Sequence, residues 1–151
     1  MTEGSRRGSL PLETIVPSGW PRPRGYSQAV RVPAGRELLF VAGQIGWDAS
    51  EQLVGADFPA QFEQALRNCV TVVQAAGGGA GDIVRLTMYC TDRGVYLRHL
   101  REVGIAYRRI MGEHYPCMSL VQVAALVEQG AQIEIEATAA LAPETGAEGG
   151  R

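Results

Sequence analysis

The sequence predicts an α+β fold in which one mixed sheet carries two helices on the same face. Runs that alternate apolar and polar residues indicate strands, and two longer runs with helical spacing of apolar residues indicate amphipathic helices. Their order is β-β-α-β-α-β-β, which gives a sheet of about five or six strands. The 151 residues, 46% of them hydrophobic, suffice for one domain with a modest core.

We expect three parts along the chain. Residues 1–24 are rich in Gly, Ser and Pro and lack periodicity, so we predict an extended N-terminal arm. Residues 25–142 form the domain. Residues 143–151 are polar and Gly-rich, and we predict a flexible C-terminal tail.

Two short strand-like runs open the domain. They are Tyr26–Val32 (YSQAVRV) and Glu37–Ala42 (ELLFVA). Pro33 and Gly35 lie between them and favour a turn. We therefore predict that the two runs pair as a β-hairpin.

The first helix is predicted over Phe58–Ala76, where apolar residues recur at i, i+3 and i+4. This length corresponds to about five turns. Asp57 suits the N-cap and Pro59 the first turn. The run Gly77–Gly79 ends the helix, and Asp82–Cys90 (DIVRLTMYC) then alternates as a strand.

The second helix is predicted to begin near Asp92. Its apolar stripe consists of Leu100, Val103, Tyr107, Ile110 and Met111. Its other side carries Arg98, Arg101, Glu102, Arg108 and Arg109. Two further strands, Met118–Leu126 and Gln132–Leu141, follow on either side of a loop that contains Gly130.

Helices on one side leave the other face of the sheet uncovered. We place on this face four alternating residues: Met118, Leu120, Gln122 and Ala124. A half-apolar open face usually meets another subunit, so the sequence predicts an oligomer.

The composition excludes several kinds of chemistry. All 14 cationic residues are arginine, so a lysine Schiff base, a pyridoxal-phosphate lysine and a phosphate-loop lysine are excluded. Any side chain that holds a substrate carboxylate by charge must be an arginine. The net charge of -2 argues against a nucleic-acid partner held by bulk electrostatics.

The same composition predicts a cytoplasmic protein. Cys69, Cys90 and Cys117 include no CxxC pair, which indicates buried thiols in a reducing compartment. The N-terminus lacks the apolar run of a signal peptide, and no stretch approaches a membrane span, so we expect no membrane partner.

Four local motifs have a structural and a functional interpretation. The glycines of GGGAGD (Gly77–Asp82) follow a helix and open a strand, which favours a helix C-cap over a phosphate loop. His114 and Cys117 have no second ligand cluster, so we predict no metal site. Cys117 as a nucleophile would need a base and an orienting group that the sequence does not place. The arginine-rich helix side is either solvated or RNA-binding, and the interleaved Glu102 favours solvation.

The last strand presents two carboxylates on one face. Alternation places Glu134 and Glu136 together, opposite Ile133 and Ile135. Periodicity alone favours carboxylates that face water. If that face meets another subunit, each carboxylate needs a partner or a function.

Five motifs, in this order, resemble the RidA/YjgF family of reactive-intermediate deaminases, also labelled endoribonuclease L-PSP. They are VAGQIGWD (Val41–Asp48), QALRN (Gln64–Asn68), GDIVRLTMYCTD (Gly81–Asp92), YPCMSLVQVAAL (Tyr115–Leu126) and IEIEATA (Ile133–Ala139). The resemblance runs from about Tyr26 to Leu141. It implies a chorismate-mutase-like fold assembled as a homotrimer, in which each inter-subunit cleft holds a small-molecule ligand.

The resemblance also implies a reaction and a site. Deaminating members hydrolyse enamines and imines, such as 2-aminoacrylate, to a keto acid and ammonia without a metal or organic cofactor. It implies Glu134 as the catalytic residue that positions water, and Tyr26 and Gly43 as parts of the cleft. Backbone groups near Gly43 and Cys117 would handle the substrate nitrogen.

This chain departs from the family at the residue that binds the substrate. The family motif Pro-x-Arg-Ser supplies an arginine for the carboxylate, but Met118 occupies that position here, within Pro116–Ser119. Leu120 replaces a cysteine, and Gly104 replaces an asparagine on the second helix. Methionine offers soft apolar contact without charge, so we expect Met118 and Leu120 to line a less polar substrate pocket.

Arg31 and Arg85 are the candidates that we consider for restoring the missing charge. Three functions remain open: an imine deaminase with altered specificity, a non-catalytic ligand-binding trimer, and an endoribonuclease or translation inhibitor. The missing arginine argues against the standard deaminase, and the acidic net charge argues against the third function.

Overall fold

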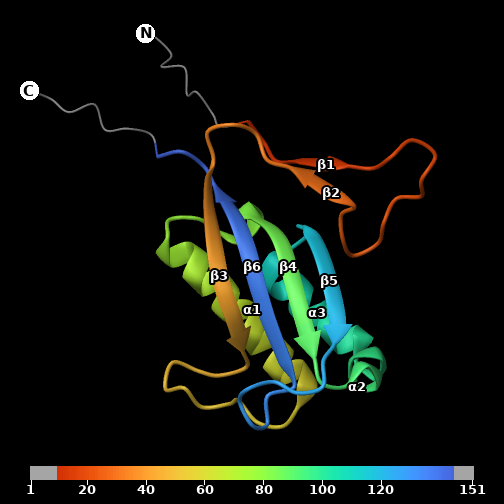
Figure 1. The fold of residues 1–151 in the computed structure, drawn as a ribbon, viewed down its shortest axis with the longest axis vertical. Coiled ribbons are helices and arrows are strands. Elements are labelled where there is room, and N and C mark those ends of the chain that lie inside the picture. The colour runs from red at the N-terminus through yellow and green to blue at the C-terminus, as the bar shows by residue number, and fades with distance from the viewer. Residues whose placement is uncertain (1–9, 145–151) are drawn as a thin grey trace, which may run out of the picture.

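The computed structural model describes residues 10–144, and four of their strands form one mixed sheet (Figure 1). These strands are β3 (Glu37–Ile45), β4 (Ile83–Cys90), β5 (Cys117–Gln122) and β6 (Ile133–Leu141). Their order across the sheet is β3-β6-β4-β5. β6 is antiparallel to β3 and β4, whereas β5 runs parallel to β4. The predicted α+β class with a mixed sheet is confirmed, but this sheet has four strands and not the expected five or six.

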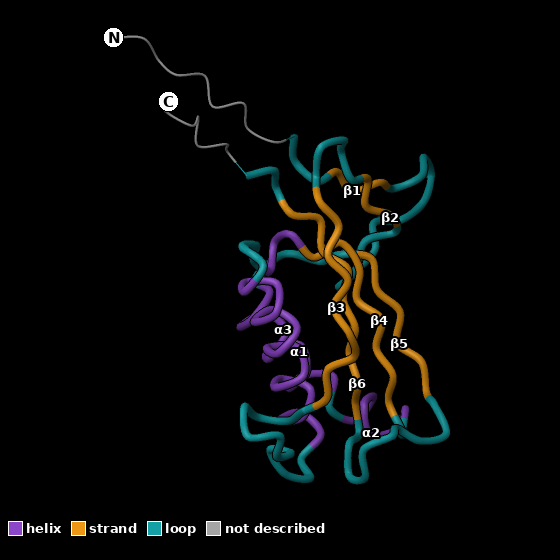
Figure 2. Tube along the Cα trace, turned by 60° about the vertical axis from the view of Figure 1, so that its left-hand side comes forward, coloured by secondary structure: helices purple, strands orange, loops and turns teal. Residues whose placement is uncertain are grey.

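Two helices, α1 (Phe58–Ala75) and α3 (Leu100–Met111), cover one face of this sheet, as predicted (Figure 2). α1 begins at the expected cap, because the Asp57 carboxylate accepts a hydrogen bond of 3.1 Å from the Ala60 amide. The core between helices and sheet includes the fully buried side chains of Phe62, Leu66, Leu86, Ile133 and Ile135. Among residues 10–144, no helix is long and apolar enough to span a membrane.

The predicted hairpin is wrong, because β2 (Ala29–Arg31) pairs with β1 (Glu13–Ile15) and not with β3. β1 lies within the predicted arm, so the two strands form a separate ribbon above the sheet (Figure 1). After β2, the buried Arg36 side chain donates a 2.8 Å hydrogen bond to the Ala140 carbonyl. This contact ties the residue before β3 to the end of β6, next to the β3–β6 pairing.

Parts of the predicted arm and tail are not covered. Residues 1–9 of the arm and residues 145–151 of the tail lie outside the described residues.

The second predicted helix is divided at His99. α2 (Arg93–Arg98) begins at Asp92, whose carboxylate accepts hydrogen bonds of 2.8 and 3.2 Å from amides of the first turn. His99 leaves the helical conformation, with φ of −110° and ψ of 18°, and its ring stacks on Phe58 with centroids 6.4 Å apart. α3 starts directly afterwards. Its buried side carries Val103, Ala106, Tyr107 and Met111, three of them from the predicted stripe.

Met118 and Leu120 of β5 point to the face opposite the predicted one. Met118 and Leu120 pair in register with Leu86 and Met88, which are buried beneath the helices. Residues in register on neighbouring strands share a face, so Met118 and Leu120 pack against the core under α3. Our placement on the open face is wrong for these two residues and for Gln122, which pairs with the buried Cys90, because the parallel pairing with β4 sets the opposite alternation. Ala124 lies beyond the end of β5.

Other apolar side chains occupy the uncovered face. Phe40 and Leu38 of β3 are 76% and 52% exposed, and Val121 of β5 is 47% exposed. The open face is therefore partly apolar, as expected, although different residues supply the apolar surface.

Candidate functional site

A pocket of about 490 Å³ opens between α3, β5 and the segment that leads into β2. Met118 and Leu120 form its floor on the β5 side, because the alternation of β5 turns both toward α3. Gly104 faces it from the helix, and Tyr26 from the preceding segment. The structure thus brings together three of the predicted substrate-binding residues and the glycine that replaces the family asparagine.

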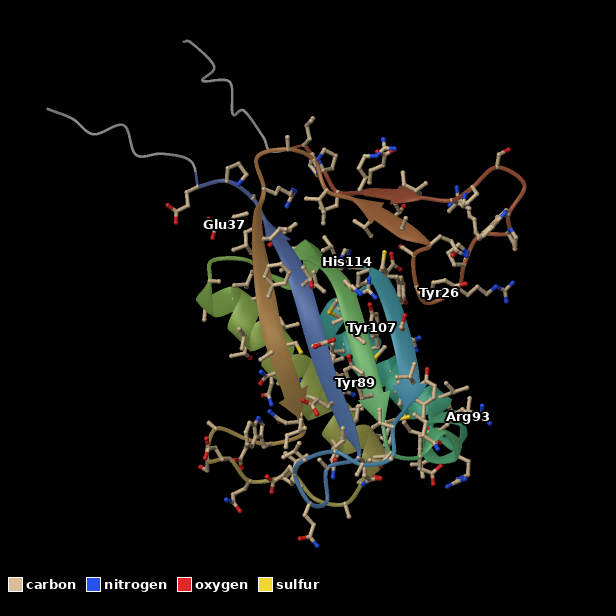
Figure 3. The ribbon with its side chains drawn as sticks, viewed as in Figure 1. Tyr26, Glu37, Tyr89, Arg93, Tyr107 and His114 are labelled. Atoms are coloured by element: carbon tan, nitrogen blue, oxygen red, sulfur yellow. The ribbon has the colours of Figure 1, made fainter. Side chains whose placement is uncertain are left out.

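Hydrogen bonds at Ser27 hold Tyr26 at this pocket. The Ser27 amide donates to the Pro116 carbonyl at 3.1 Å, and the Ser27 hydroxyl donates to the Tyr115 carbonyl. Both carbonyls directly precede β5. The segment between β1 and β2 is therefore attached to the start of β5, and Figure 3 shows Tyr26 beside that strand.

A pair of stacked tyrosines builds another wall of the pocket. The rings of Tyr107 and Tyr115 are nearly parallel, at 8°, with centroids 5.2 Å apart. The Tyr107 hydroxyl donates a 2.7 Å hydrogen bond to the His114 carbonyl. Burial raises the pKa of Tyr107 well above its ordinary value, so its hydroxyl stays neutral. Burial likewise raises the pKa of Tyr96, which also lines the pocket.

Two arginines, Arg24 and Arg108, supply the positive charge of this pocket. The candidates considered from the sequence lie elsewhere. Arg31 pairs with Glu13 on the ribbon at 3.2 Å. Arg85 borders a separate hollow on the open face of the sheet, together with Glu136.

Glu134 and Gly43 form a second group, on the uncovered face. Gly43 lies in an irregularity of the β3–β6 pairing, between Val41 and Gln44. A Cβ atom at Gly43 would lie only 2.0 Å from Oε1 of Glu134, so the carboxylate occupies the space that a side chain would fill. The glycine is thus required for this position of the Glu134 carboxylate.

The carboxylate of Glu136, two residues after Glu134 on β6, is already hydrogen-bonded. The Tyr89 hydroxyl donates a 2.8 Å hydrogen bond to Oε1 of Glu136. Glu134 stands opposite Tyr89 in the strand register, and within residues 10–144 its carboxylate has no hydrogen-bond or ion-pair partner. Figure 3 shows Tyr89 over the middle of the sheet.

Within one chain, the group of Glu134 and Gly43 and the pocket around Met118 lie on opposite faces of the sheet. Glu134 and Gly43 lie on the open face, whereas Met118 and Leu120 point toward the helices. Cys117 precedes Met118 and pairs in register with the exposed Arg85, so alternation directs its thiol toward the open face.

Cys69, Cys90 and His114 lie in surroundings that suit structural roles. Burial raises the pKa of Cys69 to about 12 and also raises that of Cys90, so both stay protonated thiols. Nε2 of His114 lies 2.6 Å from the Ile83 carbonyl. Among residues 10–144, no group of three His, Cys, Asp or Glu side chains is placed to bind a metal ion.

Sequence reasoning missed Arg24, Arg108 and the tyrosine wall. We assigned Arg108 to a solvated helix side because its neighbours are charged. The available signal was its spacing of four residues from Gly104, which places both on one side of α3.

The chain matches a known protein family. The family described as endoribonuclease L-PSP matches residues 21–141, which is most of the chain. The chain belongs to this family, which includes the RidA and YjgF proteins.

The chain resembles family members of known structure or activity. The human 2-iminobutanoate/2-iminopropanoate deaminase is 35% identical over 121 residues, which cover 80% of this chain and 82% of the human protein. The Rid-family protein YyfB of Yersinia pestis is 34% identical, with a TM-score of 0.77 over 87% of this chain and 100% of YyfB. E. coli TdcF, solved with bound serine, is 32% identical, with a TM-score of 0.59 over 85% of this chain and 98% of TdcF.

Proposed function

We propose that the protein hydrolyses an enamine or imine to a carbonyl compound and ammonia. The observation that carries this proposal is the Glu134 carboxylate, held in the space beside Gly43 while Glu136 is engaged by Tyr89. An uncommitted carboxylate on a partly apolar face is suited to bind and activate water. The similarity to the human iminobutanoate/iminopropanoate deaminase supports the same reaction class.

The proposed cleft requires more than one copy of the chain. Glu134 lies on the uncovered face, whereas the pocket around Met118 lies toward the helices. We propose a homotrimer in which Glu134 and Gly43 of one subunit face the pocket of the next. The exposed side chains of Leu38, Phe40 and Val121 support burial of this face against another subunit.

The reaction would proceed by general-base hydrolysis. An enamine first takes a proton on carbon while its nitrogen loses one, and so becomes the imine. Glu134 then accepts a proton from water while the water oxygen bonds to the imine carbon. The protonated Glu134 passes that proton to the nitrogen, which regenerates the carboxylate. The resulting carbinolamine loses ammonia as its C–N bond breaks, and its hydroxyl proton is transferred to the departing nitrogen. Water and imine are thereby converted to a carbonyl compound and ammonia.

The substrate of this protein would differ from 2-aminoacrylate. Met118 and Leu120 make the β5 wall apolar where deaminating relatives have an arginine and a cysteine. A small anionic imine would lose its bidentate partner and much of its orientation.

The test is imine hydrolysis with imines made in situ by an amino-acid oxidase. Semicarbazide competes for the imine, so a deaminase lowers the yield of semicarbazone. We expect wild type to act on at least one bulky imine, Glu134→Ala to be inactive, and Glu136→Gln, the control on the same strand, to stay active. Activity that survives Glu134→Ala unchanged would overturn the mechanism.

The second candidate is a non-catalytic protein that binds a small ligand. The observation that favours it is Met118 at the position of the carboxylate-binding arginine. Met118→Arg separates the two candidates. Should wild type be inert with every imine while Met118→Arg gains activity, the fold keeps the machinery and the natural protein binds a ligand without turnover.

A further inference from the structure

We propose that Arg108 takes over the role of the missing arginine, with help from Arg24, and that the pocket selects 2-imino acids with large apolar or aromatic side chains. The reaction named here rests on the proposed function. The recognition itself concerns binding, so it is testable without turnover.

The position of Arg108 depends on Gly104. The two residues are one turn apart on α3, and Nη1 of Arg108 lies 3.6 Å from the point where a Cβ at Gly104 would stand. The arginine side chain therefore extends back over the glycine, in the direction helical side chains favour. The family asparagine would place a polar side chain in this space. Here the space belongs to the guanidinium, which borders the pocket.

The charge of Arg108 is not neutralised within the chain. Among residues 10–144, neither Arg108 nor Arg24 takes part in an ion pair. The adjacent Arg109 differs, because its Nη1 donates to both carboxylate oxygens of Glu63 at 2.9 and 3.0 Å. Of the described residues, those that line the pocket include no Asp or Glu. Two arginines beside one pocket without an acidic residue favour an anionic ligand.

The remainder of the pocket favours a large apolar group on that anion. Its volume of about 490 Å³ lies in the range of small-molecule sites, roughly 300–1,000 Å³. Met88, Met118 and Leu120 offer adaptable apolar contacts, and Tyr107 and Tyr115 offer aromatic faces. A carboxylate at the arginines and an aromatic ring against these walls would use both parts of the pocket. The imine of 2-aminoacrylate would fill only the charged part.

The position of the arginine also alters the geometry of binding. The family arginine comes from the β5 position now held by Met118, whereas Arg108 comes from α3 on the facing wall. A carboxylate held from α3 leaves the β5 side free for the substrate side chain. Methionine in place of arginine at position 118 thus makes apolar the part of the pocket that is charged in deaminating relatives.

Binding of phenylpyruvate, the keto-acid product of the phenylalanine imine, tests this assignment. Isothermal titration would compare wild type with Arg108→Gln, Arg108→Lys and the control Arg101→Gln, an exposed position on α3 outside the pocket. We expect Arg108→Gln to weaken binding by roughly tenfold or more, because a charge-assisted hydrogen bond is lost. Arg108→Lys should be intermediate, and Arg101→Gln should bind like wild type.

Two further ligands separate the charge from the apolar contacts. Pyruvate keeps the carboxylate without the ring, and we expect it to bind more weakly than phenylpyruvate. Phenylacetone keeps the ring and ketone without the carboxylate, so its binding should not respond to Arg108→Gln. Far-ultraviolet circular dichroism would establish that each variant is folded.

Several results would overturn the assignment. One is phenylpyruvate binding that Arg108→Gln leaves unchanged, and another is equal affinity for pyruvate and phenylpyruvate. Failure of the proposed function looks different, because Arg108-dependent binding would then persist while no imine is hydrolysed. Imine turnover that is insensitive to Arg108 would reject this inference and leave the proposed function standing.

Discussion

The Tyr89 hydroxyl donates a 2.8 Å hydrogen bond to Oε1 of Glu136, across the boundary between β4 and β6. This bond engages one of two carboxylates that share a sheet face. Glu134 stands opposite Tyr89 in the register but remains without such a partner within residues 10–144. The two glutamates of IEIEA thus have different surroundings, which supports a structural role for Glu136 and a site role for Glu134.

The Tyr89–Glu136 bond predicts a measurable change in a tyrosine pKa. The hydrogen bond to Glu136, together with burial and the negative charge of that carboxylate, raises the pKa of Tyr89. We expect Glu136→Gln to lower it toward the ordinary value of 10.0. Ultraviolet titration of phenolate, with Tyr89→Phe subtracted to isolate the one tyrosine, measures the shift. An unaltered titration would show that the bond does not form in solution.

Because the Glu134 carboxylate lies so close to Gly43, we expect a substitution at Gly43 to lower activity without unfolding the protein. A methyl group at this position would collide with the Glu134 carboxylate, since the Cβ would stand 2.0 Å from Oε1. The carboxylate must then move, and a displacement near 1 Å can lower a rate by about a hundredfold. We expect this reduction in imine turnover for Gly43→Ala. Gly81→Ala is the control, because its added Cβ would meet no atom within 4 Å.

The exposed side chain of Phe40 provides a test of the proposed trimer. Its side chain is 76% exposed on the uncovered face of the sheet, so in the proposed trimer it would be buried against another subunit. We expect Phe40→Arg to shift the assembly toward monomers, because burial of an unpaired charge is costly. Sedimentation velocity measures the shift. Val127→Arg alters an even more exposed apolar residue outside the sheet and should leave the assembly intact.

We expect removal of the buried hydrogen bonds of Gln61 to lower the stability of the protein strongly. Its fully buried amide donates to the Gly55 and Gly130 carbonyls at 2.7 and 3.0 Å and accepts from the Gln132 amide at 2.8 Å. Gln61→Leu removes all three bonds and leaves three backbone groups without their partner. We expect the free energy of unfolding to fall by about 2–5 kcal/mol.

Urea unfolding at fixed protein concentration measures this change. Gln74→Leu, at an exposed position of the same helix, is the matched control and should shift stability by less than about 0.5 kcal/mol. Equal effects of the two substitutions would contradict the bridging role of Gln61.

The local patterns were most informative where each run had one apolar face. The alternation of β6 and the helical spacing of α1 correctly predicted both elements and the cap at Asp57, because these patterns report burial directly. The choice of strand partner was not local. β2 pairs with β1 from the predicted arm, whereas β3 pairs with β6, and the Arg36–Ala140 contact beside that pairing joins residues 104 positions apart.

The site was predicted less completely, for a related reason. The resemblance placed Tyr26, Met118 and Leu120 in one pocket, and the structure brings them together. The alternation of β5 alone did not reveal which face it turns to the helices, because both faces of that strand carry apolar residues. Arg108 was missed because a charged helix side is usually solvated, and only the packing of α3 shows that this residue borders a pocket.

The two halves of the proposed site lie on opposite faces of one sheet, and this arrangement has a genetic consequence. A subunit altered at Glu134 still offers an intact pocket, and a subunit altered at Arg108 still offers an intact carboxylate. Mixed assemblies of the two would contain clefts in which both intact halves meet. Two alleles that are each inactive alone would then complement one another when expressed together.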